Sequence, residues 1–170
     1  DNDLAPTIAS VSSASVTEGA SLVYTVALTN PSATATTFNY TLGGGTASTA
    51  DYGTPTFSNG VTISNGQLTV PAGVTSFSIT VPTIDDNIFE ASETVPLTVG
   101  GKSATGTITD NDSAPTVTSV SAANAIEGAD LVYTVNLSNP SATATTFSYT
   151  LGGGTASTAD YGTPTFSNGV

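Results

Sequence analysis

The chain has 170 residues, among them 33 Thr and 21 Ser, but no Cys, His, Met or Trp, and one cation, Lys102, faces 13 acidic residues for a formal net charge of -12. Without His or Cys there is no imidazole base, no thiolate nucleophile and no zinc or iron–sulfur site of the usual kind, and a single cation is too few to bind nucleic acid. No apolar run reaches ~18 residues and no signal-peptide pattern opens the sequence, so we expect neither a membrane span nor a signal peptide in these residues.

Alternation of apolar and polar residues predicts a series of short β-strands. The predicted strands, in chain order, lie at residues 7–16, 22–29, 38–42, 68–70, 77–81, 95–99 and 104–108. Between them lie Gly, Pro and Asn, including two Asn-Gly pairs at residues 59–60 and 65–66 that suit type I′ hairpin turns. About seven or eight short strands in roughly 100 residues, without a helical period, predict an all-β, immunoglobulin-like antiparallel β-sandwich.

The sequence repeats itself with an offset of 109 residues. Residues 1–61 match residues 110–170 at 50 of 61 positions, and the match is complete from Tyr40 and Tyr149 onward. Such similarity between neighbours indicates tandem repeats of 109 residues. We therefore expect a complete repeat in residues 1–112, with 1–6 as the tail of a preceding repeat, and the N-terminal half of a second repeat in residues 113–170.

The acidic residues of the complete repeat lie in four segments outside the predicted strands. The segments hold Glu18; Asp51; Asp85, Asp86, Glu90 and Glu93; and Asp110 with Asp112. Because strands of an antiparallel sandwich leave alternately from its two ends, counting strands places all four segments at the same end. The opposite end, around residues 30–31, 71–73 and 100–101, carries no acidic residue.

Eight carboxylates at one end would repel each other unless some are protonated or hard cations bind. Oxygen-only ligands, six to eight per ion, are what Ca²⁺ prefers, whereas Mg²⁺ takes fewer carboxylates and keeps water. The pattern therefore predicts Ca²⁺ as the cofactor. The alternative is that these acids only keep the surface soluble.

The same motifs resemble those of a known family. These motifs are Glu18-Gly19, Asp51-Tyr52, Asp-Asp-x-Ile-x-Glu-x-x-Glu at residues 85–93 and Gly-Thr-Ile-Thr-Asp-Asn-Asp at residues 106–112. Together the four motifs resemble those of the Calx-β domain. The resemblance implies an immunoglobulin-like sandwich with a Ca²⁺ cluster in its loops, as in sodium–calcium exchangers and large bacterial extracellular, RTX-type adhesins. The metal ligands that it implies are Glu18, Asp51, Asp85, Asp86, Ile88 through its backbone carbonyl, Glu90, Glu93, Asp110 and Asp112.

Residues 113–170 contain three acidic residues, Glu127, Asp130 and Asp160. The counterpart of the acidic segment at residues 85–93 is not among them, so we do not expect the second repeat to form a complete site. Its strands also lack a second sheet, which leaves their edges open. Three arrangements remain open at this point: the half repeat is unfolded, another chain completes it, or residues 62–109 pair with it in place of residues 1–61.

These features predict a non-catalytic, calcium-binding spacer in a long extracellular bacterial adhesin, secreted or at the cell surface. Its partners would be neighbouring repeats, and Pro115 would limit the freedom of the linker between them. A filament subunit joined by lateral or strand-exchange contacts, with self-association through the incomplete second repeat, is the alternative. A carbohydrate- or protein-binding module, with Tyr52 and Tyr161 stacking on a sugar, is a third. Asp85 and Asp86 could in principle serve a glycosidase, but their motif matches metal ligands, so we expect no enzyme.

Overall fold

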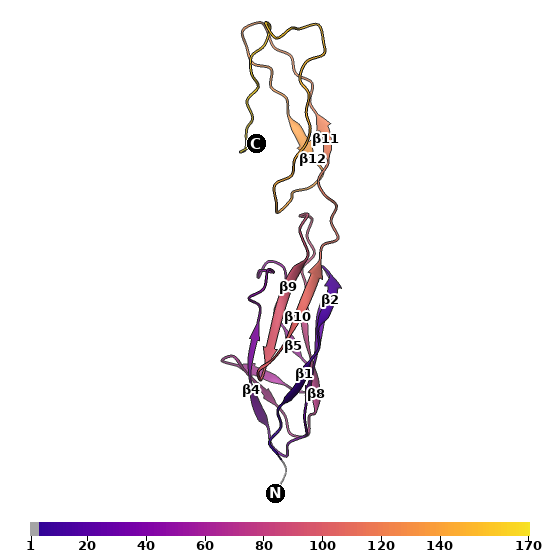
Figure 1. The fold of residues 1–170 in the computed structure, drawn as a ribbon, viewed down its shortest axis with the longest axis vertical. Coiled ribbons are helices and arrows are strands. Elements are labelled where there is room, and N and C mark those ends of the chain that lie inside the picture. Colours follow the sequence, from indigo (N-terminus) through magenta and orange to yellow (C-terminus); the bar gives the residue numbers. More distant parts are fainter. Residues whose placement is uncertain (1–3) are drawn as a thin grey trace.

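The computed structural model describes residues 4–170, which form two packed sheets and a separate strand pair (Figure 1). The strands are β1 (Ile8–Val11), β2 (Ala14–Thr17), β3 (Ser21–Leu28), β4 (Thr36–Leu42), β5 (Thr56–Phe57), β6 (Thr62–Ser64), β7 (Gln67–Val70), β8 (Ser76–Pro82), β9 (Glu93–Val99), β10 (Lys102–Thr109), β11 (Val117–Val120) and β12 (Val135–Leu137). One sheet has the order β1-β3-β8-β5 and the other β2-β10-β9-β4-β7-β6, while β11 pairs with β12.

The fold is the predicted all-β, immunoglobulin-like sandwich. Every strand pair is antiparallel except β10 with β2, which is parallel. No helix occurs among residues 4–170, and so none there is long and apolar enough to cross a membrane. Asp1 and Asp3, which we expected in the tail of a preceding repeat, lie outside the described residues.

The first predicted strand is in fact two strands in different sheets. β1 pairs with β3, whereas β2 pairs with β10. Between them, the Ser12 N–H donates to the Thr25 carbonyl at 2.9 Å, and the Ser12 Oγ accepts the Thr25 N–H at 2.8 Å. The prediction of one continuous strand over residues 7–16 is wrong because a side-chain oxygen replaces the backbone acceptor at Ser12, and the chain then crosses to the other sheet.

Both Asn-Gly pairs have the left-handed backbone that type I′ turns require, but only one closes a hairpin. Asn65 and Gly66, with φ of 51° and 74°, join the paired strands β6 and β7. Asn59 and Gly60, with φ of 56° and 72°, lead instead from β5 in the four-stranded sheet to β6 in the other. The second predicted hairpin is therefore a connection between the sheets.

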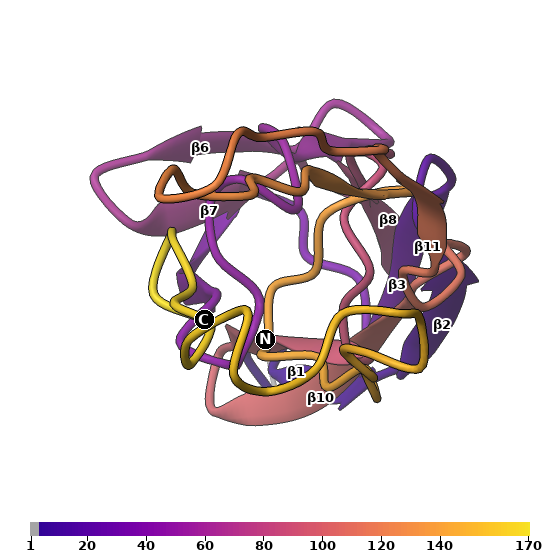
Figure 2. The ribbon, with the colours of Figure 1, turned by 90° about the horizontal axis from the view of Figure 1, so that it is seen from above.

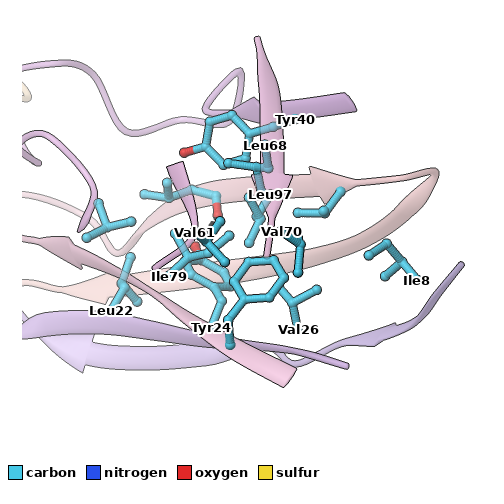
Figure 3. Packing of buried hydrophobic residues seen from close by; sticks show 14 of the residues in the cluster. Ile8, Leu22, Tyr24, Val26, Tyr40, Val61, Leu68, Val70, Ile79 and Leu97 are labelled. Atoms are coloured by element: carbon cyan, nitrogen blue, oxygen red, sulfur yellow. Dashed lines mark hydrogen bonds between the residues drawn. The ribbon is translucent and has the colours of Figure 1, made fainter. Parts of the chain in front are cut away.

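The hydrophobic core lies between the two sheets and is made of residues 8–108 (Figure 3). Alternate residues of β3 and β9 are buried, as the period of two predicted. Tyr24 is the largest fully buried side chain, and its hydroxyl donates to the Val95 carbonyl of the opposite sheet at 2.6 Å. Gly106 of β10 makes room for it, because a Cβ at that position would overlap the Tyr24 hydroxyl.

Residues 113–170 repeat the apolar residues of the first sandwich without burying them. Leu131 and Tyr133 are 50% and 48% exposed, whereas their counterparts Leu22 and Tyr24 are 0% exposed. The half repeat stacks on one end of the first sandwich (Figures 1 and 2). The strands β6 to β10 pair within the first sandwich and not with the half repeat, so the exchanged pairing is not the one adopted.

We predict that Gly106→Ala destabilises the sandwich, because the new methyl group must displace the buried Tyr24. Overpacking of this kind costs roughly 1–3 kcal/mol, and each kcal/mol lowers the unfolding midpoint by ~4–8 °C in a domain of this size. Gly154→Ala is the matched control, because its Cβ position has nothing within 4 Å. Equal midpoints for the two variants in thermal unfolding would contradict the close contact.

We also predict a loss of stability in alkali. Burial raises the pKa of Tyr24 and of Tyr40 to about 12. From about pH 10 upward the unfolded chain releases phenolic protons that the folded chain keeps, so the free energy of unfolding falls as pH rises. Denaturant titrations should give a lower midpoint at pH 11 than at pH 9, and a smaller drop in Tyr40→Phe. The same drop in that variant would exclude Tyr40 as a source.

Candidate metal centre

Four segments of the first repeat meet at the end of the sandwich that faces the half repeat (Figure 1). The parallel pairing of β2 with β10 places Glu18 beside Asp110, and the Glu18 N–H donates to the Thr109 carbonyl at 3.0 Å. The Asp51 segment reaches the same end because the Ile84 N–H donates to the Asp51 carbonyl at 2.9 Å. The strand count of the sequence therefore placed these segments at the end where the structure has them.

The carboxylates form two clusters. Oxygens of Glu18, Asp110 and Asp112 lie within 4.8 Å of one another, and so do oxygens of a second cluster, made of Asp51, Glu90 and Glu93. We call these the linker cluster and the loop cluster. Both contribute to a hollow of about 10 Å³, which holds roughly one water-sized sphere and is too small for a sugar.

Asp110 connects residues 85–93, which we call the acidic loop, to the linker at residues 110–116. Its Oδ2 accepts the Glu90 N–H at 2.6 Å and its Oδ1 accepts the Asp112 N–H at 2.8 Å. Burial raises the pKa of Asp110, but these main-chain donors outweigh it and hold the pKa below its ordinary value. Asp110 is thus ionised and fixed in place at neutral pH.

Two further predicted ligands, Asp85 and Asp86, lie outside both clusters. The Asp85 Oδ1 accepts the Asn111 Nδ2 at 2.8 Å, and the Asp86 Oδ1 accepts the Ile88 N–H at 2.7 Å. Both aspartates are exposed, so each keeps oxygen lone pairs free at the rim of the site. The structure therefore divides the eight predicted carboxylates into an inner group of six and a rim of two. The Ile88 carbonyl remains a predicted ligand.

Asn111 is a site residue that the sequence analysis missed. Its side chain donates to Asp85, and its N–H donates to the Glu18 Oε1 at 3.3 Å. It thereby joins the rim to the linker cluster. Its sequence position gave no clear signal, because its side chain bonds to Asp85 of a distant loop and not to Asp110 or Asp112 beside it.

Four other acids of the two clusters have raised pKa values. Burial, followed by the charge of Asp51 and Glu90, raises the pKa of Glu93 to about 7. Burial and neighbouring carboxylates likewise raise the pKa of Glu18, Glu90 and Asp112. The raised pKa values mean that burial and crowding disfavour the charged carboxylates, which favours either proton uptake or a bound cation.

Among residues 4–170, no cation compensates this charge. Lys102 begins β10, whose far end leads to Asp110. At ~3.3 Å per residue, Lys102 and Asp110 lie roughly 26 Å apart along the strand, well beyond the range of an effective surface pair. The Asp112 Oδ2 is also buried without a hydrogen-bond partner among residues 4–170. A site of oxygen ligands with an unsatisfied buried carboxylate oxygen fits a hard cation.

Solved structures similar to this chain include CBD12 from CALX1.2 and the calcium-binding domain CBD12 of CALX1.1. Each is 21% identical over 68% of this chain, with TM-scores of 0.47 and 0.48. The matches cover 48% and 50% of those chains, so this chain spans about half their length.

A further similar structure is the sixth cohesin of scaffoldin B from Acetivibrio cellulolyticus, crystallised with a mutant Cel5 dockerin. It is 14% identical, with a TM-score of 0.33, over 64% of this chain and 100% of that one. Comparisons with protein-family models and with curated proteins find no match.

We predict that Asn111→Asp destabilises the metal-free protein. The change replaces the amide that donates to Asp85 with another carboxylate, and like charges ~4 Å apart repel by about 1 kcal/mol even in water. The unfolding midpoint in EGTA and low salt should fall, and added salt should restore part of it. Asn124→Asp adds the same charge to an exposed loop of the half repeat. An equal fall in that control would show that the effect is one of net charge alone.

Proposed function

We propose that this chain is a non-catalytic, calcium-binding β-sandwich module that serves as a Ca²⁺-rigidified spacer in a long extracellular bacterial adhesin. The observation that carries the proposal is the convergence of four chain segments into two carboxylate clusters with no cation nearby. The linker cluster and the loop cluster would each hold an ion. Bound Ca²⁺ would supply the positive charge that the inner carboxylates lack.

The donor set favours Ca²⁺ over Mg²⁺. Ca²⁺ accepts six to eight oxygens in flexible geometry, whereas Mg²⁺ requires a near-octahedral shell and retains several waters. The inner group offers six carboxylates, and Asp85 and Asp86 at the rim offer more. So dense a set of carboxylates suits the larger ion.

The position of the linker cluster supports the spacer role. Asp110 and Asp112 follow β10 directly and begin the linker to the half repeat, in which Pro115 is buried. An ion shared by Glu18, Asp110 and Asp112 would fasten the start of the linker to the sandwich. Stabilisation by a bound ion grows with the ratio of its concentration to its Kd, so millimolar extracellular calcium suits such a module.

A filament joined by strand exchange is the second candidate, and the open half repeat favours it. Its exposed apolar side chains include Leu131, Tyr133, Val135, Phe147 and Tyr149. Such a surface can pair with another chain. Concentration-dependent self-association that calcium does not change would favour the filament over the spacer.

The calcium proposal predicts a large thermal shift. Ca²⁺ at 100 times its Kd adds about 2.7 kcal/mol per site, so the unfolding midpoint should rise by ~10 °C or more in millimolar Ca²⁺ relative to EGTA. Mg²⁺ should have little effect. Asp51→Asn should lose much of the rise because it removes a member of the loop cluster.

The repeat provides the matched control for that experiment. Asp160 occupies the same loop as Asp51 and accepts the Ser157 N–H at 2.7 Å, as Asp51 accepts the Ser48 N–H at 2.5 Å. Among residues 4–170 it belongs to neither cluster. Asp160→Asn should therefore keep the full calcium shift. A midpoint that calcium does not change in the native chain would refute the metal proposal.

A further inference from the structure

The acidic loop of the first repeat contacts the second repeat through the main chain of Phe89. The Phe89 N–H donates to the Pro140 carbonyl at 3.1 Å. The Phe89 carbonyl accepts the Ala142 N–H at 3.1 Å and the Ser141 Oγ at 3.3 Å. Phe89 and Ser141 thus form a parallel β-bridge between the two stacked units (Figure 1).

The neighbours of Phe89 hold it in place from within the first repeat. The Ile88 N–H is bonded to Asp86, and the Glu90 N–H is bonded to Asp110. The donors on both sides of Phe89 are therefore used inside the acidic loop. Phe89 is the residue of this stretch whose N–H and carbonyl both bond to the second repeat.

The receiving segment, Asn139-Pro140-Ser141-Ala142, is a loop that we call the docking loop. Its Asn139 Nδ2 donates to the Pro140 carbonyl at 3.2 Å and to the Ser113 carbonyl, in the linker, at 3.0 Å. The Ser141 Oγ accepts the Thr143 N–H at 3.3 Å. The docking loop is thus shaped by its own bonds and fastened to the linker.

The first repeat contains the same loop without a docked partner. Residues 30–33 have the identical sequence, and Asn30 donates to the carbonyls of Pro31 at 3.3 Å and Leu4 at 2.8 Å. Among residues 4–170, no residue bonds to the Ala33 N–H. The loop therefore keeps its internal bonds whether or not a Phe89 segment is docked. A preformed loop loses little conformational entropy on docking.

We propose that the docking loop is a binding surface for the main chain of the acidic loop, and that this contact, rather than the linker alone, fixes the orientation of consecutive repeats. This inference rests on the proposed spacer function and extends it, because it names the following repeat as the partner of the acidic loop. The contact itself uses only protein groups. The copy of the docking loop at residues 30–33 presents the same groups at the other end of the sandwich.

A distance measurement across the joint tests this proposal. The chain has no Cys, so Ser64→Cys and Val120→Cys, both at exposed positions in separate units, give two unique sites for spin labels. Double electron–electron resonance on the full chain should show one narrow distance distribution. Ala142→Pro removes the N–H that bonds to the Phe89 carbonyl, and the narrow peak should be lost.

Two pairs of variants keep the test specific. Ala33→Pro makes the same change in the undocked copy of the loop and should leave the narrow peak intact. Ser141→Ala should broaden the peak less than Ala142→Pro, and Ser32→Ala should not broaden it. Circular dichroism on each variant checks that the sandwich is folded.

Recording all spectra in EGTA and in Ca²⁺ separates this inference from the proposed function. A narrow peak in either buffer that Ala142→Pro abolishes supports the docking loop, even if calcium leaves the unfolding midpoint unchanged. A distribution that is broad in both buffers in the labelled parent, or that Ala142→Pro leaves as narrow as Ala33→Pro does, would overturn it.

Discussion

Eight carboxylates of the first repeat share one end of the sandwich, while the only cation of the chain begins β10 at the other end. Their mutual repulsion opposes folding, and the structure relieves it only in part. Main-chain N–H groups compensate Asp110. Burial and neighbouring charge raise the pKa of Glu93 to about 7, and the Asp112 Oδ2 has no hydrogen-bond partner among residues 4–170. The proposed divalent cation would relieve the rest, because it would replace repulsion between carboxylates with attraction to a shared ion.

The crowded negative charge also bears on where the first repeat contacts the half repeat. Asp110 accepts hydrogen bonds from Glu90 in the acidic loop and from Asp112 in the linker, so one carboxylate organises both. The acidic loop then carries Phe89 to the docking loop of the next repeat, and Asn139 fastens that loop to the linker. Charge, linker and inter-repeat contact thus meet within a few residues. We therefore expect that a change in the charged clusters or in the linker also alters the inter-repeat contact, although that contact contains no charged group.

Much of this arrangement could be predicted from the sequence, because alternation reports which residues share a face. It identified β3, β8 and β9 and, by counting strands, the end at which the acids gather. It could not show that residues 7–16 divide at Ser12 between two sheets, because the alternation continues through the break. It could not show which acids share a cluster either, since the partnership of Glu18 with Asp110, for example, depends on the parallel register of β2 with β10. The contact of Phe89 with the docking loop uses mainly backbone groups, which leave no trace in the sequence.

The most direct measurement is an anomalous difference map from crystals grown with Ca²⁺, recorded at a long wavelength where calcium scatters anomalously. The account predicts one peak between Glu18, Asp110 and Asp112 and another between Asp51, Glu90 and Glu93, with the second peak lost in Asp51→Asn and kept in Asp160→Asn. A map with no calcium peak at either cluster would contradict the central claim and leave the acids as surface charge on a metal-independent sandwich.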